Sequence, residues 1–253
     1  MYRTLAIVTA GASAFAVFSW ASGQDGMAPA GGAREVFPHV RVDIGARAVE
    51  FDGEVPISLA DTKAPRVYLE LIACIRDTKE HESLVMTLAR PSHVHAALLS
   101  IGLEPGAPAK WTQKEGKVIP HAPTGSPVKV EFLTKDATGA TVVSTPSQWI
   151  ANARSGEAWP GGGEIGKGHW VFAGSITEAR DGRDDYYADE AGTLVGLTSF
   201  GTEVIAWSGV LSPDSTVDEP EWIADAKHVP AMGTKVTVRI SAVDAPAVPN
   251  AQP

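Results

Sequence analysis

Short runs of apolar and β-branched residues recur along this chain, and Gly and Pro clusters separate them, as at residues 104–108 and 159–163. Runs of this kind, bounded by turn-forming residues, are typical of β-strands. So many short strands constrain the fold strongly, because each strand needs neighbours in a sheet to satisfy its backbone groups. We predict strands at residues 40–51, 66–76, 81–88, 128–134, 141–144, 170–173, 193–199, 204–207 and 235–243.

One segment, at residues 91–102, has a convincing helical pattern. Pro91 suits the first turn of a helix, and Gly102 suits the position after its last turn. Four apolar residues between them recur at helical spacing and form one face, namely Val94, Ala97, Leu98 and Ile101. Residues 146–153 are a possible second helix. We therefore predict a β-rich α+β domain whose antiparallel sheets form a sandwich or an open barrel.

The first residues of the chain have the pattern of a cleaved secretory signal. Arg3 is followed by residues 4–20, which carry no charge, and small residues precede a cleavage site after Ala21 or Gly23. We therefore expect an exported protein, in the periplasm or outside the cell, with an uncleaved N-terminal anchor as the alternative. The expected segments are a signal at 1–21, a flexible linker at 22–35, a single domain at 36–243 and a disordered tail at 244–253.

Charge and cysteine content exclude some classes of protein. The net charge is -9, and Lys and Arg form no run or stripe, so we expect no nucleic-acid partner. Cys74 is the only cysteine and cannot form an internal disulfide, so an apolar core must stabilise the fold. No run of about 18 apolar residues follows the signal, so we expect no membrane span after cleavage.

Two predicted strands, at 66–76 and 81–88, are joined by a short turn, which favours an antiparallel hairpin. In the register that makes one face almost wholly apolar, Glu82 is the one carboxylate on that face. Cys74 then lies on the opposite face, diagonal to His81. This hairpin and the helix that follows it hold most of the residues that could carry chemistry.

The predicted helix contains two histidines, His93 and His95. They point about 200° apart on a helix, so they cannot bind one metal ion together. His95 flanks the apolar face, and packing of this face on the hairpin can bring His95 to Glu82. A partly buried carboxylate and histidine can form a general base or a pair of metal ligands. The alternative is a structural pair, in which case Glu82→Ala lowers thermal stability.

Cys74 and His81 form a second candidate pair, because a neighbouring histidine can lower the pKa of a thiol. The alternative is that Cys74 serves as a small buried apolar side chain. The candidate catalytic residues are Glu82, His95, Cys74 and His81. The candidate metal ligands are His81, Glu82 and His95, with Zn²⁺ or Cu as the metal.

Several short motifs resemble one known family. KEHESL at 79–84 follows Cys74, and PSHVHAALLSIG at 91–102, WVFAGS at 170–175 and YADEAGTLV at 187–195 come later. In order and spacing they resemble the YdjY-like domain of exported bacterial proteins, with Asp77 and Thr78 where Gly-rich turn residues are expected. The resemblance implies an exported β-rich domain of uncharacterised function and supplies no catalytic residues.

Three functions remain open at this stage. The first is a non-catalytic envelope protein that binds a partner protein or a small ligand. The second is a metal-binding or redox accessory protein that uses the unit at residues 74–95. The third is a hydrolase that uses Glu82 with His95, or Cys74 with His81.

Overall fold

The computed structural model describes residues 32–61, 63, 65–160, 168–180 and 182–243. The chain divides into two units, Met1–Ala30 and Gly31–Pro253, and the described residues all belong to the second. The predicted signal, most of the predicted linker and the predicted tail at 244–253 lie outside the described residues.

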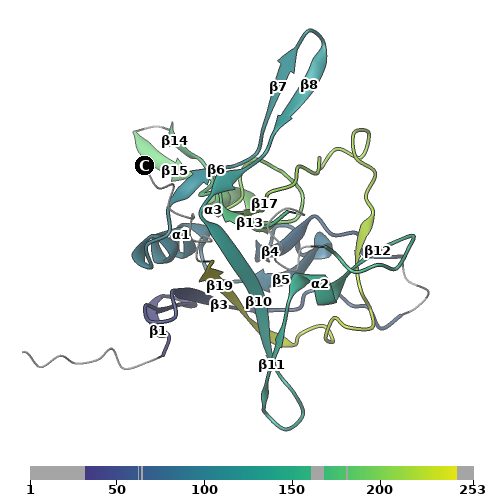
Figure 1. Ribbon diagram of the computed structural model, residues 1–253. Coiled ribbons are helices and arrows are strands. Elements are labelled where there is room, and N and C mark those ends of the chain that lie inside the picture. Colours follow the sequence, from purple (N-terminus) through teal and green to yellow (C-terminus); the bar gives the residue numbers. More distant parts are fainter. Residues whose placement is uncertain (1–31, 62, 64, 161–167, 181, 244–253) are drawn as a thin grey trace, which may run out of the picture. The chain divides into compact units, whose positions relative to one another are not determined.

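Eight strands form a ring in which each strand pairs with two neighbours (Figure 1). In ring order they are β3 (Ala48–Glu54), β19 (Lys235–Ala242), β10 (Pro127–Lys135), β13 (Trp170–Phe172), β17 (Ile205–Trp207), β16 (Thr193–Gly196), β4 (Leu71–Ile75) and β5 (Ser83–Thr87). The ring closes where β5 pairs with β3, at Gly53 and Glu54. Only glycine fits at position 53, because a Cβ there would lie 2.4 Å from Cγ1 of Val85.

The remaining described strands extend the ring or form small ribbons. β1 (Arg34–Phe37) and β2 (Val40–Asp43) continue the sheet from β3, and β11 (Thr141–Ser144) pairs with β10. The two-stranded ribbons are β6 (Pro105–Ala107) with β9 (Thr124–Gly125), β7 (Lys110–Lys114) with β8 (Lys117–His121), β12 (Ile150–Asn152) with β18 (Trp222–Ala224), and β14 (Thr177–Arg180) with β15 (Arg183–Tyr186). This barrel-like, mostly antiparallel arrangement confirms the predicted β-rich α+β class.

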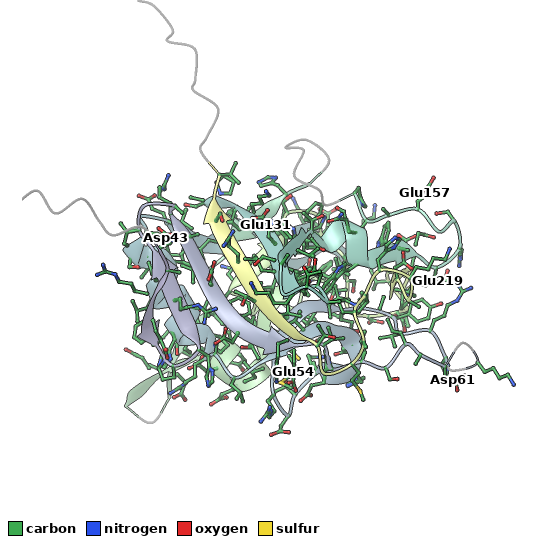
Figure 2. The ribbon with its side chains drawn as sticks, turned by 90° about the horizontal axis from the view of Figure 1, so that it is seen from below. Asp43, Glu54, Asp61, Glu131, Glu157 and Glu219 are labelled. Carbon is green, nitrogen blue, oxygen red and sulfur yellow. The ribbon has the colours of Figure 1, made fainter. Side chains whose placement is uncertain are left out.

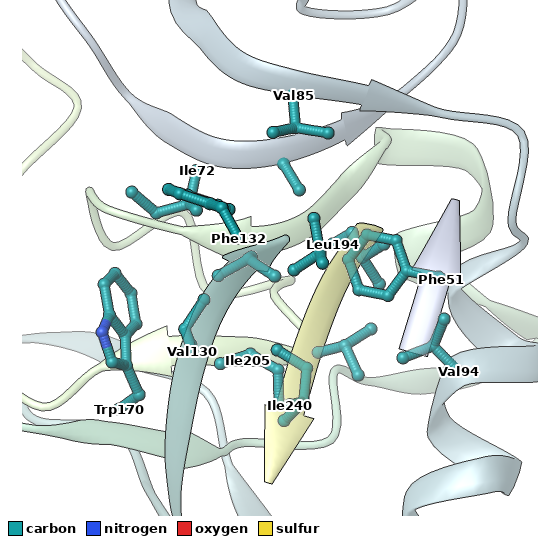
Figure 3. Close-up of a cluster of buried hydrophobic side chains, with 14 of the residues drawn as sticks. Phe51, Ile72, Val85, Val94, Val130, Phe132, Trp170, Leu194, Ile205 and Ile240 are labelled. Atoms are coloured by element: carbon teal, nitrogen blue, oxygen red, sulfur yellow. The ribbon is translucent and has the colours of Figure 1, made fainter. Parts of the chain in front are cut away.

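The core lies inside the ring, and alternation along the strands builds it. β10 and β19 place every second side chain in the interior, where Phe132 is opposite Val238. Val238 is in turn opposite Phe51 of β3, and all three side chains are fully buried. Figure 3 shows how apolar side chains from the ring strands meet one another and Val94 of the helix. Burial of this apolar surface is the main stabilising term for a chain without a disulfide.

The predicted single strand at 40–51 is wrong, because the structure divides it into β2 and β3. A turn separates the two strands, and in it the Asp43 carboxylate accepts the backbone N–H of Ala46 at 2.9 Å. Ile44, inside the predicted strand, is 59% exposed in this turn. An aspartate that caps a turn in this way competes successfully with continuation of the strand.

The predicted antiparallel hairpin is also wrong, because β4 and β5 are parallel. Leu71 pairs with Ser83 and Cys74 pairs with Met86, and the chain returns through a short 3-10 helix, η1 (Glu80–Glu82). Both strands are almost wholly buried, so neither has a solvent-exposed face that marks its direction. An apolar face alone therefore could not distinguish the two pairings.

The helix predicted at 91–102 is confirmed as α1 (Pro91–Ser100). Pro91 occupies the first turn, and the apolar face of α1 packs on β2 and β3. Asp189 of α3 (Tyr187–Ala191) holds the beginning of α1, because its carboxylate accepts the N–H of Ser92 at 2.8 Å and the hydroxyl at 2.7 Å. The possible helix at 146–153 is shorter than predicted: α2 (Pro146–Trp149) ends where β12 begins.

Candidate functional site

The structure does not bring Glu82 and His95 together. The Glu82 carboxylate lies 2.6 Å from Nζ of Lys79 and 3.6 Å from Nε2 of His81. His95 instead has its Nδ1 atom 2.8 Å from the hydroxyl of Tyr186. Among the described residues no ion pair or hydrogen bond joins Glu82 to His95, so their expected contact is absent there. The short return through η1 places Glu82 beside Lys79 instead.

His95 and Tyr186 form a neutral, partly buried pair. The Tyr186 hydroxyl donates to the carbonyl of Gly174 at 3.0 Å, so its oxygen can accept the Nδ1 proton of His95. Burial lowers the pKa of His95 and raises the pKa of Tyr186, so both stay uncharged near neutral pH. The imidazole also packs edge-on against Phe172, with ring centroids 4.9 Å apart. These contacts hold α1 against β13 and β15.

Cys74 and His81 are placed in different environments. Cys74 is fully buried and packs with Leu71 and Met86 on the outer side of the ring. Burial raises the pKa of its thiol, which disfavours the nucleophilic thiolate. The His81 side chain is 80% exposed and points to solvent beside Glu82. The described residues contain no group of three or more His, Cys, Asp or Glu side chains placed to hold a metal ion.

Lys79 occupies the centre of a small charged cluster that the sequence analysis did not identify. Its Nζ atom lies 3.6 Å from the Glu70 carboxylate and 2.6 Å from that of Glu82. The same ammonium group lies 4.5 Å from the centre of the Phe200 ring. Burial raises the pKa of Glu70, and the charge of Glu82 raises it further. The three-residue spacing of Lys79 and Glu82 was the only local signal for this cluster.

Glu203 is a fully buried carboxylate that sequence analysis also missed. It accepts the backbone N–H of Phe200, and that of Gly201 at 3.1 Å, so it fastens the turn before β17. Burial raises the pKa of Glu203. Gly196 of β16 leaves room for it, because a Cβ there would lie 2.4 Å from Cγ of Glu203. Glu203 therefore has a structural role, because it stabilises the turn before β17.

A groove of about 590 Å³ lies on the outer face of the ring, over β3, β19 and the end of β10. Figure 2 shows β19 in yellow beside β3, with Glu54 labelled near one end of β19. Residues of the β1–β2 turn, the end of β4 and the segment from Met86 to Leu88 complete the walls. The groove therefore combines residues from opposite ends of the chain, between His39 and Arg239.

A ladder of ion pairs fixes most of the charged side chains at the groove. Arg239 lies 2.7 Å from Glu50, which it faces across the pairing of β19 with β3. Arg41 lies 3.4 Å from Glu50 and 2.8 Å from Asp52. Lys235 is paired with Glu54 in the same way. Because each carboxylate of the groove already has a cationic partner, these groups neutralise one another.

Two cations of the groove have no carboxylate partner among the described residues. They are Arg76, which follows β4, and Lys135, whose ammonium group donates to the Thr141 hydroxyl at 2.7 Å. Apolar side chains lie beside them, including Leu88, which is 48% exposed, and Leu133. The groove thus offers an apolar surface and two uncompensated positive charges in a chain with a net charge of -9. This combination suits an amphipathic anion.

The fold and the groove place this chain in the class of barrel-like β proteins with a charged groove on the outer face. The chain belongs to the YdjY domain family, whose model matches residues 40–241. A search of the curated proteins finds no match, and none of the solved structures matches either. None of the helices in the described part of the chain has the length and hydropathy needed to span a bilayer.

Proposed function

We propose that this protein is an exported, non-catalytic binding protein whose outer groove holds a small amphipathic ligand with an anionic group. The observation that carries the proposal is the pair Arg76 and Lys135, which line the groove without carboxylate partners among the described residues. An anionic group placed between them gains charge-assisted hydrogen bonds. The apolar part of the ligand would cover Leu88 and Leu133.

Size and rigidity support a small ligand. A volume of about 590 Å³ falls within the usual range of small-molecule sites. The ion-pair ladder of Glu50, Arg41 and Arg239 fixes one wall before any ligand arrives. A preformed wall reduces the entropy that binding must overcome. The metal-binding and hydrolase alternatives lack comparable support, because His95 pairs with Tyr186 and not with Glu82, and because Cys74 is buried whereas His81 is exposed.

Export is the second part of the proposal, and the sequence supports it. Residues 4–20 carry no charge, and small residues stand at the cleavage positions. N-terminal sequencing of protein from a periplasmic fraction should begin at Ser22 or Gln24. A mature chain that still begins at Met1 would contradict cleavage and would favour the anchor.

Isothermal titration with decanoate tests the groove, because decanoate combines one carboxylate with an apolar chain. We expect binding to the wild type, an affinity at least about tenfold lower for Arg76→Ala with Lys135→Ala, and little binding of decanol. The matched control, Lys129→Ala with Lys227→Ala, removes the same charge outside the groove and should bind normally. No binding of decanoate, or equal losses in both double variants, would contradict the proposal.

A further inference from the structure

The hairpin of β7 and β8 projects from the rest of the described chain (Figure 1). Its turn, Glu115 and Gly116, has positive φ angles of 53° and 75°, which match the tight two-residue turn that suits β-hairpins. Every residue of the two strands is exposed, and β7 and β8 pair only with each other. An isolated two-stranded ribbon is marginally stable in water, so a covering partner would stabilise it.

The pairing register separates the hairpin into two different faces. Trp111 is opposite Pro120 and Gln113 is opposite Val118, and these four residues share one face. Trp111 is 36% exposed and Val118 is 60% exposed. The hairpin therefore presents an aromatic and aliphatic surface to solvent.

The other face is cationic. Its cross-strand pairs are Lys110 with His121, Thr112 with Ile119, and Lys114 with Lys117. A contact of 2.8 Å between the Thr112 hydroxyl and Nε2 of His121 agrees with this register. None of the three lysines forms an ion pair with another described residue, although the whole chain carries a net charge of -9. Positive charge is thus concentrated on a fully exposed hairpin of an acidic chain, where Glu115 of the turn is the one carboxylate.

We propose that this hairpin binds the surface of an anionic lipid bilayer. Trp111 and Val118 would enter the boundary between headgroups and acyl chains, where tryptophan is favoured. The lysines have flexible apolar stems, so their ammonium groups reach the anionic headgroups while the opposite face is immersed. This role is separate from ligand binding in the groove, since the two share no residue.

The projection of the hairpin reduces the electrostatic repulsion between this acidic chain and an anionic bilayer. An acidic protein is repelled by an anionic surface, but charges separated by more than about 8 Å are largely screened at physiological salt. The hairpin projects from the rest of the described chain, so its lysines and Trp111 can contact the bilayer while most of the acidic surface lies farther from the headgroups. A second copy of this acidic chain is the competing occupant of the hairpin, and the test below distinguishes it from a bilayer.

Flotation with lipid vesicles tests the proposal with the full mature chain. Wild-type protein should float with vesicles that contain roughly 30% phosphatidylglycerol in phosphatidylcholine, and not with phosphatidylcholine alone. Lys114→Glu with Lys117→Glu should lower the bound fraction by about tenfold, and Trp111→Ala should lower it independently of salt. Melting temperatures of these variants should match the wild type, because the altered side chains are exposed.

A matched control makes the outcome decisive. Lys63→Glu with Lys227→Glu changes the net charge equally at exposed positions outside the hairpin, and should leave flotation unchanged. Equal losses in both double variants, or no flotation of the wild type, would overturn the proposal. So would a dimer in light scattering that the hairpin variants dissociate without any vesicle binding, since the hairpin would then bind a second copy.

Discussion

Two parts of the barrel wall differ in how their sequences relate to their pairing. In β10 and β19, buried side chains alternate with more exposed ones, and the two strands are antiparallel. In β4 and β5 nearly every residue is buried, and the strands are parallel. The first pair has a solvated outer face, whereas Phe200 covers the outer face of the second near Cys74.

The difference follows from which faces of the strands are in contact with solvent, and it also determines where a ligand can bind. A strand with one solvated face must alternate, so its register can be read from the sequence. A strand covered on both faces gains apolar burial in either direction, so its pairing depends on distant neighbours. The groove lies on the solvated side, where charges are available for a ligand.

The largest expected effect is a difference in the loss of unfolding free energy between a core substitution in β4 and a surface substitution in β19. Ile72→Ala in β4 removes a fully buried side chain, so we expect the free energy of unfolding to fall by about 2–5 kcal/mol. Thr237→Ala, on the outer face of β19, should change it by less than about 1 kcal/mol. Urea denaturation measures both variants. Similar losses would show that the outer face of β19 is as tightly packed as β4.

The next comparison is between carboxylates. Because burial raises the pKa of Glu203, the folded protein binds its proton more tightly than the unfolded chain does. Stability should therefore fall as pH rises above the unfolded value of about 4.3. Glu203→Gln should remove this decline, whereas Glu50→Gln should not. Parallel curves of stability against pH for wild type and Glu203→Gln would contradict the role of burial.

A smaller effect concerns the contact of α1 with β15. Tyr186→Phe removes the hydroxyl that links His95 to Gly174, and should cost about 0.5–1.5 kcal/mol of unfolding free energy. Tyr187→Phe is a matched control on the adjacent residue and should cost less than about 0.5 kcal/mol. Thermal and urea unfolding compare the two variants. A larger loss for Tyr187→Phe would refute the importance of the His95–Tyr186 bond.

The smallest effect should come from Glu82. Its carboxylate pairs with Lys79 near the surface, so Glu82→Ala should cost less than about 1 kcal/mol. A double-mutant cycle of Glu82→Ala and His95→Ala should show coupling of less than about 0.3 kcal/mol, because the residues have separate partners. Stronger coupling would show that Glu82 and His95 interact, as the sequence analysis expected.

Much of the fold could be predicted from the sequence, but the candidate site could not. Alternation located β10 and β19 closely, and helical spacing located α1. The groove could not be predicted, because Arg76 and Lys135 lie far apart in the sequence and come to line one groove only through the ring. Glu82 and His95 seemed suitable partners because a local hairpin was assumed, and the parallel return through η1 gave each a different neighbour.

The sequence by itself determined the β-rich class, the position of α1 and membership of the YdjY domain family. These depend on interactions over a few residues, such as strand alternation, the first-turn proline and helical spacing. Only the tertiary structure decided that β4 and β5 are parallel, that Gly53 allows β5 to close the ring, and that Arg76 and Lys135 lack carboxylate partners among the described residues. Those features depend on which distant segments pack together, and no local pattern encodes that choice when a strand is buried on both faces.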